Sequence, residues 1–99
     1  MTVELKDALA TINNNIGQLK KEYFVKKVGI FGSVAKGKST KKSDIDVLVE
    51  FNKPVGFFKF IKLENFLKRK LKRKVDLITK NGIKPILKKT ILKEVVYAK

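Results

Sequence analysis

Two apolar runs joined by a short glycine- and lysine-rich segment constrain the fold of this chain more than any other feature. The runs cover residues 24–31 and 44–51, and both are rich in β-branched and aromatic residues. Such runs between glycine, proline or polar clusters are typical of β-strands. The joining segment has room for a short helical turn over residues 33–38 and an exposed basic loop over residues 40–43. We therefore predict two strands linked by a short connection.

Two carboxylates one residue apart, Asp44 and Asp46, begin the second strand. Residues i and i+2 of a strand point to the same face, so we expect the two side chains to lie side by side. Carboxylates this close repel each other unless a cation lies between them. A third carboxylate, Asp76, lies in a run over residues 75–79 that predicts another strand. If the two strands are neighbours, Asp76 can complete a metal site, because two metal ions about 3.5–4 Å apart need ligands from more than one strand.

The segment before these carboxylates has the residue types of a phosphate site. Gly32 lets the backbone approach a phosphate, and Ser33 can donate its hydroxyl and N–H to phosphate oxygens. Lys36 or Lys38 can neutralise phosphate charge. The stretch from Gly32 to Asp46 therefore predicts a site for a metal-bound nucleoside triphosphate.

The same segment matches a second pattern, the Walker A sequence G-x-x-x-x-G-K-[ST], over residues 32–39. A P-loop must open a crossover helix whose N-terminus binds the phosphates, and a parallel crossover takes about a dozen residues or more. Only residues 40–43 separate Ser39 from the next strand, which leaves no room for that helix. We therefore favour the carboxylate site over a P-loop.

The absence of cysteine and histidine limits the chemistry available to this chain. It excludes disulfides, zinc sites of the usual kind and Ser-His-Asp catalysis. Any bound metal must be held by oxygen ligands, which favours Mg²⁺ or Mn²⁺. The net charge of +15 lies mostly in residues 51–99. That excess leaves open both a polyanionic partner and a solvated lysine-rich surface.

Helical periodicity predicts three longer helices, over residues 2–22, 56–71 and 83–97. Thr2 is the expected N-cap of the first. In the second, we expect the aromatic cluster that begins with Phe57 and Phe58 to be core rather than a base-stacking platform. The predicted order of elements is α-β-(α)-β-α-β-α.

The chain shows no repeat or linker, so we expect a single domain over residues 1–99. No apolar run approaches the roughly 18 residues of a membrane span. No signal peptide is visible at the N-terminus either. These observations together predict a cytoplasmic protein.

The combined motif Gly32-Ser33, Asp44-x-Asp46 and strand residue Asp76 closely resembles the polymerase β-type nucleotidyltransferase superfamily. The combination is far more specific than either part alone. The resemblance implies that Asp44 and Asp46 bridge two Mg²⁺ ions and that Asp76 ligates the second of them. It also implies an α+β fold whose three-stranded mixed core sheet is flanked by helices.

Within that superfamily, the segments 32–37 and 43–49 look like those of the minimal nucleotidyltransferase (MNT) proteins. The segments 74–79 and 83–97 look like the C-terminal half of that group, so the resemblance covers nearly the whole chain. One departure is Lys36, where the family commonly has arginine. Lysine keeps the charge but lacks the bidentate fork of arginine.

This resemblance implies a function as well as a fold. MNT proteins are typically the antitoxins of toxin–antitoxin pairs whose toxin is a HEPN-domain protein, usually a ribonuclease. The resemblance therefore implies a protein adenylyltransferase that moves AMP from ATP to a hydroxyl, often a tyrosine, of a HEPN toxin.

Two rival functions stay open from the sequence. The basic run at residues 68–74 would suit a nucleotidyltransferase that modifies RNA, although the chain has no room for a separate RNA-binding domain. Alternatively, the chain would be a non-catalytic antitoxin that masks a toxin by binding it. The three aspartates argue against that alternative, because a binding module does not need them.

Overall fold

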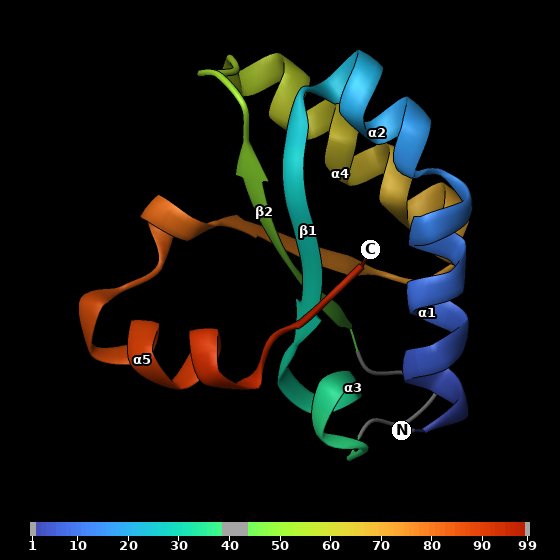
Figure 1. The fold of residues 1–99 in the computed structure, drawn as a ribbon, viewed down its shortest axis with the longest axis vertical. Helices are drawn as coiled ribbons and strands as arrows, with labels where there is room; N and C mark the ends of the chain where they lie inside the picture. The colour runs from blue at the N-terminus through green and yellow to red at the C-terminus, as the bar shows by residue number, and fades with distance from the viewer. Residues whose placement is uncertain (1, 39–43, 99) are drawn as a thin grey trace.

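The centre of the protein is a four-stranded mixed sheet in the order β3-β2-β1-β4 (Figure 1), as seen in a computed structural model that describes residues 2–38 and 44–98. The strands are β1 (Val25–Phe31), β2 (Ile45–Phe51), β3 (Val75–Thr79) and β4 (Val96–Tyr97). β1 pairs antiparallel with both β2 and β4, whereas β2 and β3 run parallel. The sequence predicted an α+β class with a mixed sheet, and the structure confirms it. The basic loop expected over residues 40–43 lies outside the described residues.

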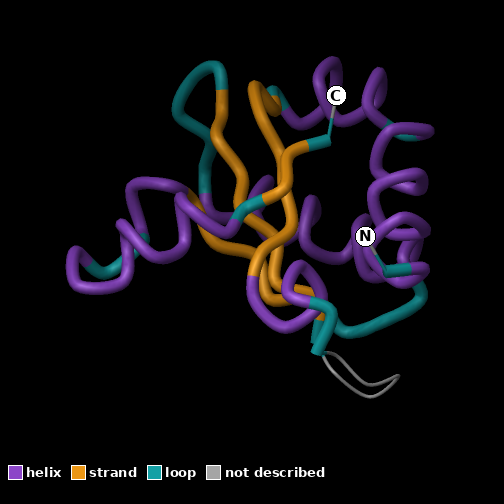
Figure 2. The backbone as a smooth tube through the Cα atoms, turned by 60° about the horizontal axis from the view of Figure 1, so that its bottom comes forward, coloured by secondary structure: helices purple, strands orange, loops and turns teal. Residues whose placement is uncertain are grey.

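Among the described residues, five α-helices and one short 3-10 helix, η1 (Lys80–Gly82), surround the sheet. The α-helices are α1 (Val3–Asn14), α2 (Ile16–Tyr23), α3 (Gly32–Lys36), α4 (Phe57–Leu71) and α5 (Pro85–Glu94). α1, α2 and α4 lie on one side of the strands, and α5 lies on the other (Figure 2). In the described part of the chain, no helix is long and apolar enough to cross a membrane.

The two faces of the sheet bury very different amounts of side chain. Alternate residues of β2, namely Ile45, Val47 and Val49, join the main core with the buried residues of α1 and α4. Leu48 points to the other face and packs in a small second cluster with Phe31 and Ile83. Because side chains alternate along a strand, Asp46 shares this second, lightly packed face with Leu48. This alternation is the period of two from which the sequence predicts that Asp44 and Asp46 lie side by side.

The first predicted helix is wrong in one respect, because the structure divides it into α1 and α2. Thr2 caps α1 as predicted, with its Oγ1 accepting from the Leu5 N–H at 3.3 Å. The helix breaks at Asn15, whose φ of −111° and ψ of 9° are not helical. The Asn15 side chain donates to the Thr11 carbonyl at 2.7 Å, a local bond with which asparagine competes against the helical ladder.

The last predicted helix is also too long, and this changes the sheet. α5 ends at Glu94, and Val96 and Tyr97 form β4, so the sheet has four strands rather than three. β4 lies against Gly29 of β1, where a Cβ would stand 2.7 Å from Val95 Cγ2 and 2.9 Å from the Val96 carbonyl oxygen. The missing side chain at Gly29 therefore lets the chain end return along the sheet, which helical periodicity alone did not reveal.

The aromatic cluster of α4 is only partly core, contrary to the prediction. Phe66 is buried, but Phe57 and Phe58 are 72% and 80% exposed. The fully buried residues of α4 begin only at Leu63, so the first turn of the helix is not buried against the core. Helical spacing located the helix correctly but not the point where its packing begins.

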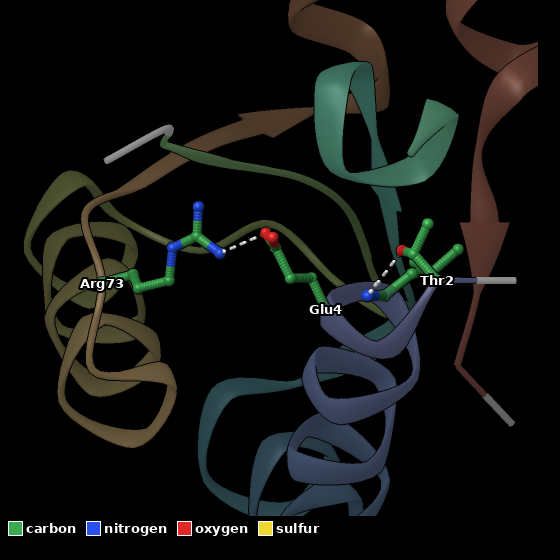
Figure 3. Close-up of polar contacts among 4 residues, drawn as sticks. Thr2, Glu4 and Arg73 are labelled. Atoms are coloured by element: carbon green, nitrogen blue, oxygen red, sulfur yellow. Dashed lines mark hydrogen bonds and ion pairs between the residues drawn. The ribbon is translucent and has the colours of Figure 1, made fainter. Parts of the chain in front are cut away.

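The basic run at residues 68–74 closes α4 and connects it to α1. Lys72 ends the helix in a left-handed conformation with φ of 57°. Arg73 then reaches Glu4 of α1, with its Nη1 3.0 Å from Glu4 Oε2 (Figure 3). Lys68 lies 3.7 Å from Glu64 one turn earlier. Part of this run therefore has a structural role.

Candidate active site

The parallel pairing of β2 with β3 brings two of the three aspartates together. The register places Asp46 directly opposite Asp76. Paired residues of neighbouring strands share a face, so both carboxylates belong to the lightly packed side of the sheet. The Ile45 N–H donates to the Lys74 carbonyl at 2.9 Å and fixes the start of β2 against β3. The neighbouring strands that a shared carboxylate site requires are thus present.

The third aspartate, Asp44, lies exposed just before β2 begins. Its effect on the site is electrostatic. The pKa of Asp46 is raised above its ordinary value, first by burial, then by the negative charge of Asp76 and then by that of Asp44. All three carboxylates therefore contribute charge to this end of the sheet.

Gly32 lies directly against the carboxylate of Asp46. Its φ of +72° favours glycine, and a Cβ at this position would collide with Asp46 Oδ2. Gly32 directly follows the end of β1, where Phe31 is the register partner of Asp46. Ser33 follows in the first turn of α3 and is half-buried. The Gly-Ser pair and the carboxylates, which are distant in sequence, are thus brought to one place.

The P-loop alternative does not fit the structure. β1 and β2 are antiparallel neighbours, whereas a P-loop helix crosses over to a parallel strand. Gly37 ends α3 with φ of +73° instead of opening a helix. Lys38 lies beyond that end, exposed, with its N–H bonded to the Ser33 carbonyl at 2.9 Å. The match to the Walker A sequence is therefore accidental and does not indicate a P-loop.

Lys36 has a partner that sequence reasoning missed. Its Nζ lies 3.1 Å from Oε1 of Glu94, the last residue of α5. The two residues are far apart in the chain, and no spacing rule connects them. The only local hint is a glutamate at a helix C-terminus, where the macrodipole disfavours negative charge.

Asp44, Asp46 and Asp76 offer only carboxylate oxygens as ligands, which is the donor chemistry of a Mg²⁺ or Mn²⁺ site. Burial and then repulsion by Asp76 and Asp44 raise the pKa of Asp46, and a bound cation relieves that repulsion. In residues 2–38 and 44–98, no three acidic side chains already stand in a metal-holding arrangement. The residues fit the ion chemically, and their side chains must draw together around it.

The family profile of the nucleotidyltransferase domain matches residues 9–98 of this chain. The chain belongs to the nucleotidyltransferase family. The superfamily resemblance seen in the sequence is thereby confirmed, and so is the enzyme class. This nucleotidyltransferase has curated relatives in archaea. It is 36% identical over 97 residues to the protein adenylyltransferase MntA of Thermococcus cleftensis, covering 98% of this chain and 96% of that protein.

The chain is also 47% identical over 81 residues to MJ0126 of Methanocaldococcus jannaschii. That protein is named as a proposed protein adenylyltransferase. That match covers 81% of this nucleotidyltransferase and 83% of the relative. These relatives confirm the closer resemblance to the MNT group.

Solved structures agree on the fold of this nucleotidyltransferase. A structure described as a proposed minimal nucleotidyltransferase superposes with a TM-score of 0.77 at 28% identity, covering 91% of this chain and 92% of that one. A toxin–antitoxin structure with AMP-PNP has a TM-score of 0.71 at 21% identity, covering 88% and 72%. A complex of a tri-AMPylated Shewanella oneidensis HEPN toxin with its MNT antitoxin has a TM-score of 0.65 at 18% identity, covering 92% and 71%.

Proposed function

We propose that this nucleotidyltransferase transfers AMP from ATP to a hydroxyl group of a HEPN toxin and so acts as its antitoxin in the cytoplasm. The observation that carries the proposal is the pairing of Asp46 with Asp76, together with the close approach of Gly32 to Asp46. It puts carboxylates for a metal next to the Gly-Ser turn. The Thermococcus relative, which aligns over nearly the whole chain, is named a protein adenylyltransferase. The Shewanella complex joins an MNT antitoxin to an AMPylated HEPN toxin, which supports the choice of partner.

The three aspartates are the proposed ligands of two Mg²⁺ ions. When bound, these ions would neutralise the triphosphate and lower the pKa of the attacking hydroxyl. Asp44 and Asp46 would hold both ions, and Asp76 would hold the one that activates the acceptor hydroxyl. Asp46 cannot be replaced by a neutral residue in this role, because the ions need its charge. The AMP-PNP found with a structural neighbour supports ATP as the donor.

The residues around Gly32 hold the nucleotide in this proposal. With no side chain at Gly32, the Asp46 carboxylate lies against the backbone at the start of α3, beside the proposed phosphate site. Ser33 donates to phosphate oxygens, and Lys36 offsets their charge. Lys38 has the lesser role, since it lies exposed beyond the end of α3. Positioning and charge compensation then supply most of the catalysis.

The transfer itself is an in-line displacement at the α-phosphorus. The acceptor oxygen, which we propose belongs to a tyrosine, forms a bond to this phosphorus. The bond from the α-phosphorus to the oxygen that bridges to the β-phosphate breaks, and pyrophosphate leaves. The hydroxyl proton passes to the Asp76 carboxylate, because the chain has no histidine to take it.

Incubation of the purified protein with α-labelled ATP, Mg²⁺ and either the HEPN toxin or RNA tests this proposal. Label is expected on the toxin, and digestion of the labelled toxin should locate it on a tyrosine. Asp46→Asn should lower incorporation by at least about 10³-fold, since a ligand charge shared by two ions is lost. Label on RNA would favour the RNA-directed alternative. Toxin neutralised equally well by Asp46→Asn would favour the non-catalytic antitoxin.

A further inference from the structure

α5 lies on the same side of the sheet as the carboxylates, and its last residue contacts α3. The C-terminal end of α5 and α3 lie next to each other in Figure 1, and an ion pair joins them. Glu94 Oε1 lies 3.1 Å from Lys36 Nζ, with the two side chains 25% and 47% exposed. This pair connects the second, lightly packed face of the sheet directly to the proposed phosphate site.

The helix itself does not explain the presence of Glu94. A carboxylate at a helix C-terminus lies against the negative end of the macrodipole. The positions three and four residues earlier, where an intrahelical cation would stand, hold Ile91 and Thr90. The ion-pair partner of Glu94 is instead Lys36, which lies in α3.

The position of Lys36 relates this pair to the nucleotide. Lys36 is the last residue of α3, and Gly32 is its first. Gly32 lies against Asp46, since a Cβ there would meet the Asp46 carboxylate. α3 therefore begins at the carboxylates, and the side chain of its last residue pairs with Glu94. A triphosphate bound at Asp46 would lie about one helical turn from Lys36.

We propose that Glu94 is the counter-ion of Lys36 while the nucleotide site is empty, and that the triphosphate of ATP displaces Glu94 from it. This inference rests on the proposed function, in which Lys36 contacts the triphosphate. Glu94 acts through Lys36 and is a positioning residue. Its charge lowers the affinity for ATP, because binding must break the ion pair. The energy of an exposed ion pair corresponds to about a two- to fivefold change in affinity.

Glu94→Gln tests the proposal through ATP binding as well as activity. Calorimetry with a non-hydrolysable ATP analogue and Mg²⁺ should show binding about two- to fivefold tighter than in the wild type. KM for ATP should fall by the same factor, whereas kcat should not follow it. Glu94→Asp keeps the charge and should return the affinity toward that of the wild type. Glu22→Gln is the matched control, since it removes a carboxylate from an exposed position of α2 and should leave ATP binding unchanged.

A double-mutant cycle separates the ion pair from a general charge effect. Lys36→Met should weaken ATP binding, and adding Glu94→Gln to it should bring little further change. Unchanged or weaker binding by Glu94→Gln alone would overturn the inference, and so would a gain that persists beside Lys36→Met. If the wild type transfers AMP while Glu94→Gln behaves identically, only this inference falls. If the wild type neither binds ATP nor transfers AMP, the proposed function falls with it.

Discussion

Asp46 lies where burial and two neighbouring carboxylates oppose its ionised form, which is why its pKa is raised. A carboxyl group with a raised pKa in the folded state binds its proton more tightly when folded than when unfolded. The free energy of unfolding therefore decreases as pH rises above the unfolded value of about 3.9, and the loss is complete above the folded pKa. At neutral pH without divalent ions, the Asp46 charge thus destabilises the fold.

Asp46→Asn should accordingly stabilise the metal-free protein at pH 7 while it abolishes transfer. We expect a higher Tm, because the substitution removes a charge that burial and two neighbouring carboxylates oppose. Thermal unfolding measured from pH 3 to pH 8 checks this, and the gain should disappear at the acid end. Asp7→Asn, which removes a charge from an exposed position of α1, is the control. A lower Tm for Asp46→Asn at pH 7 would contradict the assignment of its raised pKa.

Gly32 is the residue whose replacement should harm stability and activity together. Gly32→Ala places a Cβ at a φ of +72° and against Asp46 Oδ2. The left-handed backbone alone costs roughly 1–2 kcal/mol. Displacement of the Asp46 carboxylate should lower kcat/KM for AMP transfer by about 10²-fold or more, since about 1 Å of misplacement can cost that much.

A second glycine provides the matched control for this prediction. Gly17 lies in α2, where an added Cβ would meet no atom within 4 Å, and its φ is not positive. Gly17→Ala should therefore raise stability by about 0.5–1 kcal/mol through helix propensity, with activity retained. Chemical unfolding and AMP incorporation measured on both variants decide the matter. Equal effects of the two substitutions would show that Gly32 has no special position.

At the level of elements, α4 shows how a helix can be apolar along its length and still be only partly buried. Phe66 packs in the main core and lies 5.3 Å from the Tyr23 ring, centroid to centroid. Phe58 lies eight residues earlier on the same helix and is 80% exposed. The sequence pattern treats these two residues alike, whereas the structure does not.

Two truncations within α4 test this difference. Phe66→Ala should lower the free energy of unfolding by about 3–5 kcal/mol, because it empties a filled core position. Phe58→Ala should change it by no more than about 0.5 kcal/mol, as expected for an exposed site. Urea unfolding of the two variants measures both values. A large loss for Phe58→Ala would mean that the first turn of α4 is covered in solution.

The remaining elements depend on single residues that helical periodicity does not register. Asn15 divides the first helix, and Gly29 admits β4 beside β1. The Ala98 N–H extends this return of the chain by donating to the Val28 carbonyl at 2.8 Å. These features arise from one side-chain hydrogen bond and one missing side chain, so a pattern averaged over many residues misses them.

Over the whole molecule, the two faces of the sheet divide stability from chemistry. The face covered by α1, α2 and α4 holds the main core. The face with the aspartates is covered only by α5, which has no fully buried residue, and by a small cluster around Leu48, as far as the described residues extend. Functional segments are drawn from regions of low local stability, and this face has few buried apolar groups to resist rearrangement. The main core can thus fix β2 and β3 while the other face accommodates a nucleotide.

The sequence by itself determined the features that depend on local order along the chain. The spacing of Asp44 and Asp46, the glycine before Ser33 and the alternation along the second strand all follow from periods of two or a few residues. These were enough to predict β1, β2 and β3, the class of fold and the family.

Only the tertiary structure decided which distant residues meet. The parallel register opposes Asp46 to Asp76, and the return of α5 along the second, lightly packed face brings Glu94 to Lys36. The same return adds β4 and makes the sheet four-stranded. Such contacts depend on where the chain comes back after many residues, which packing of whole elements determines and no local spacing encodes.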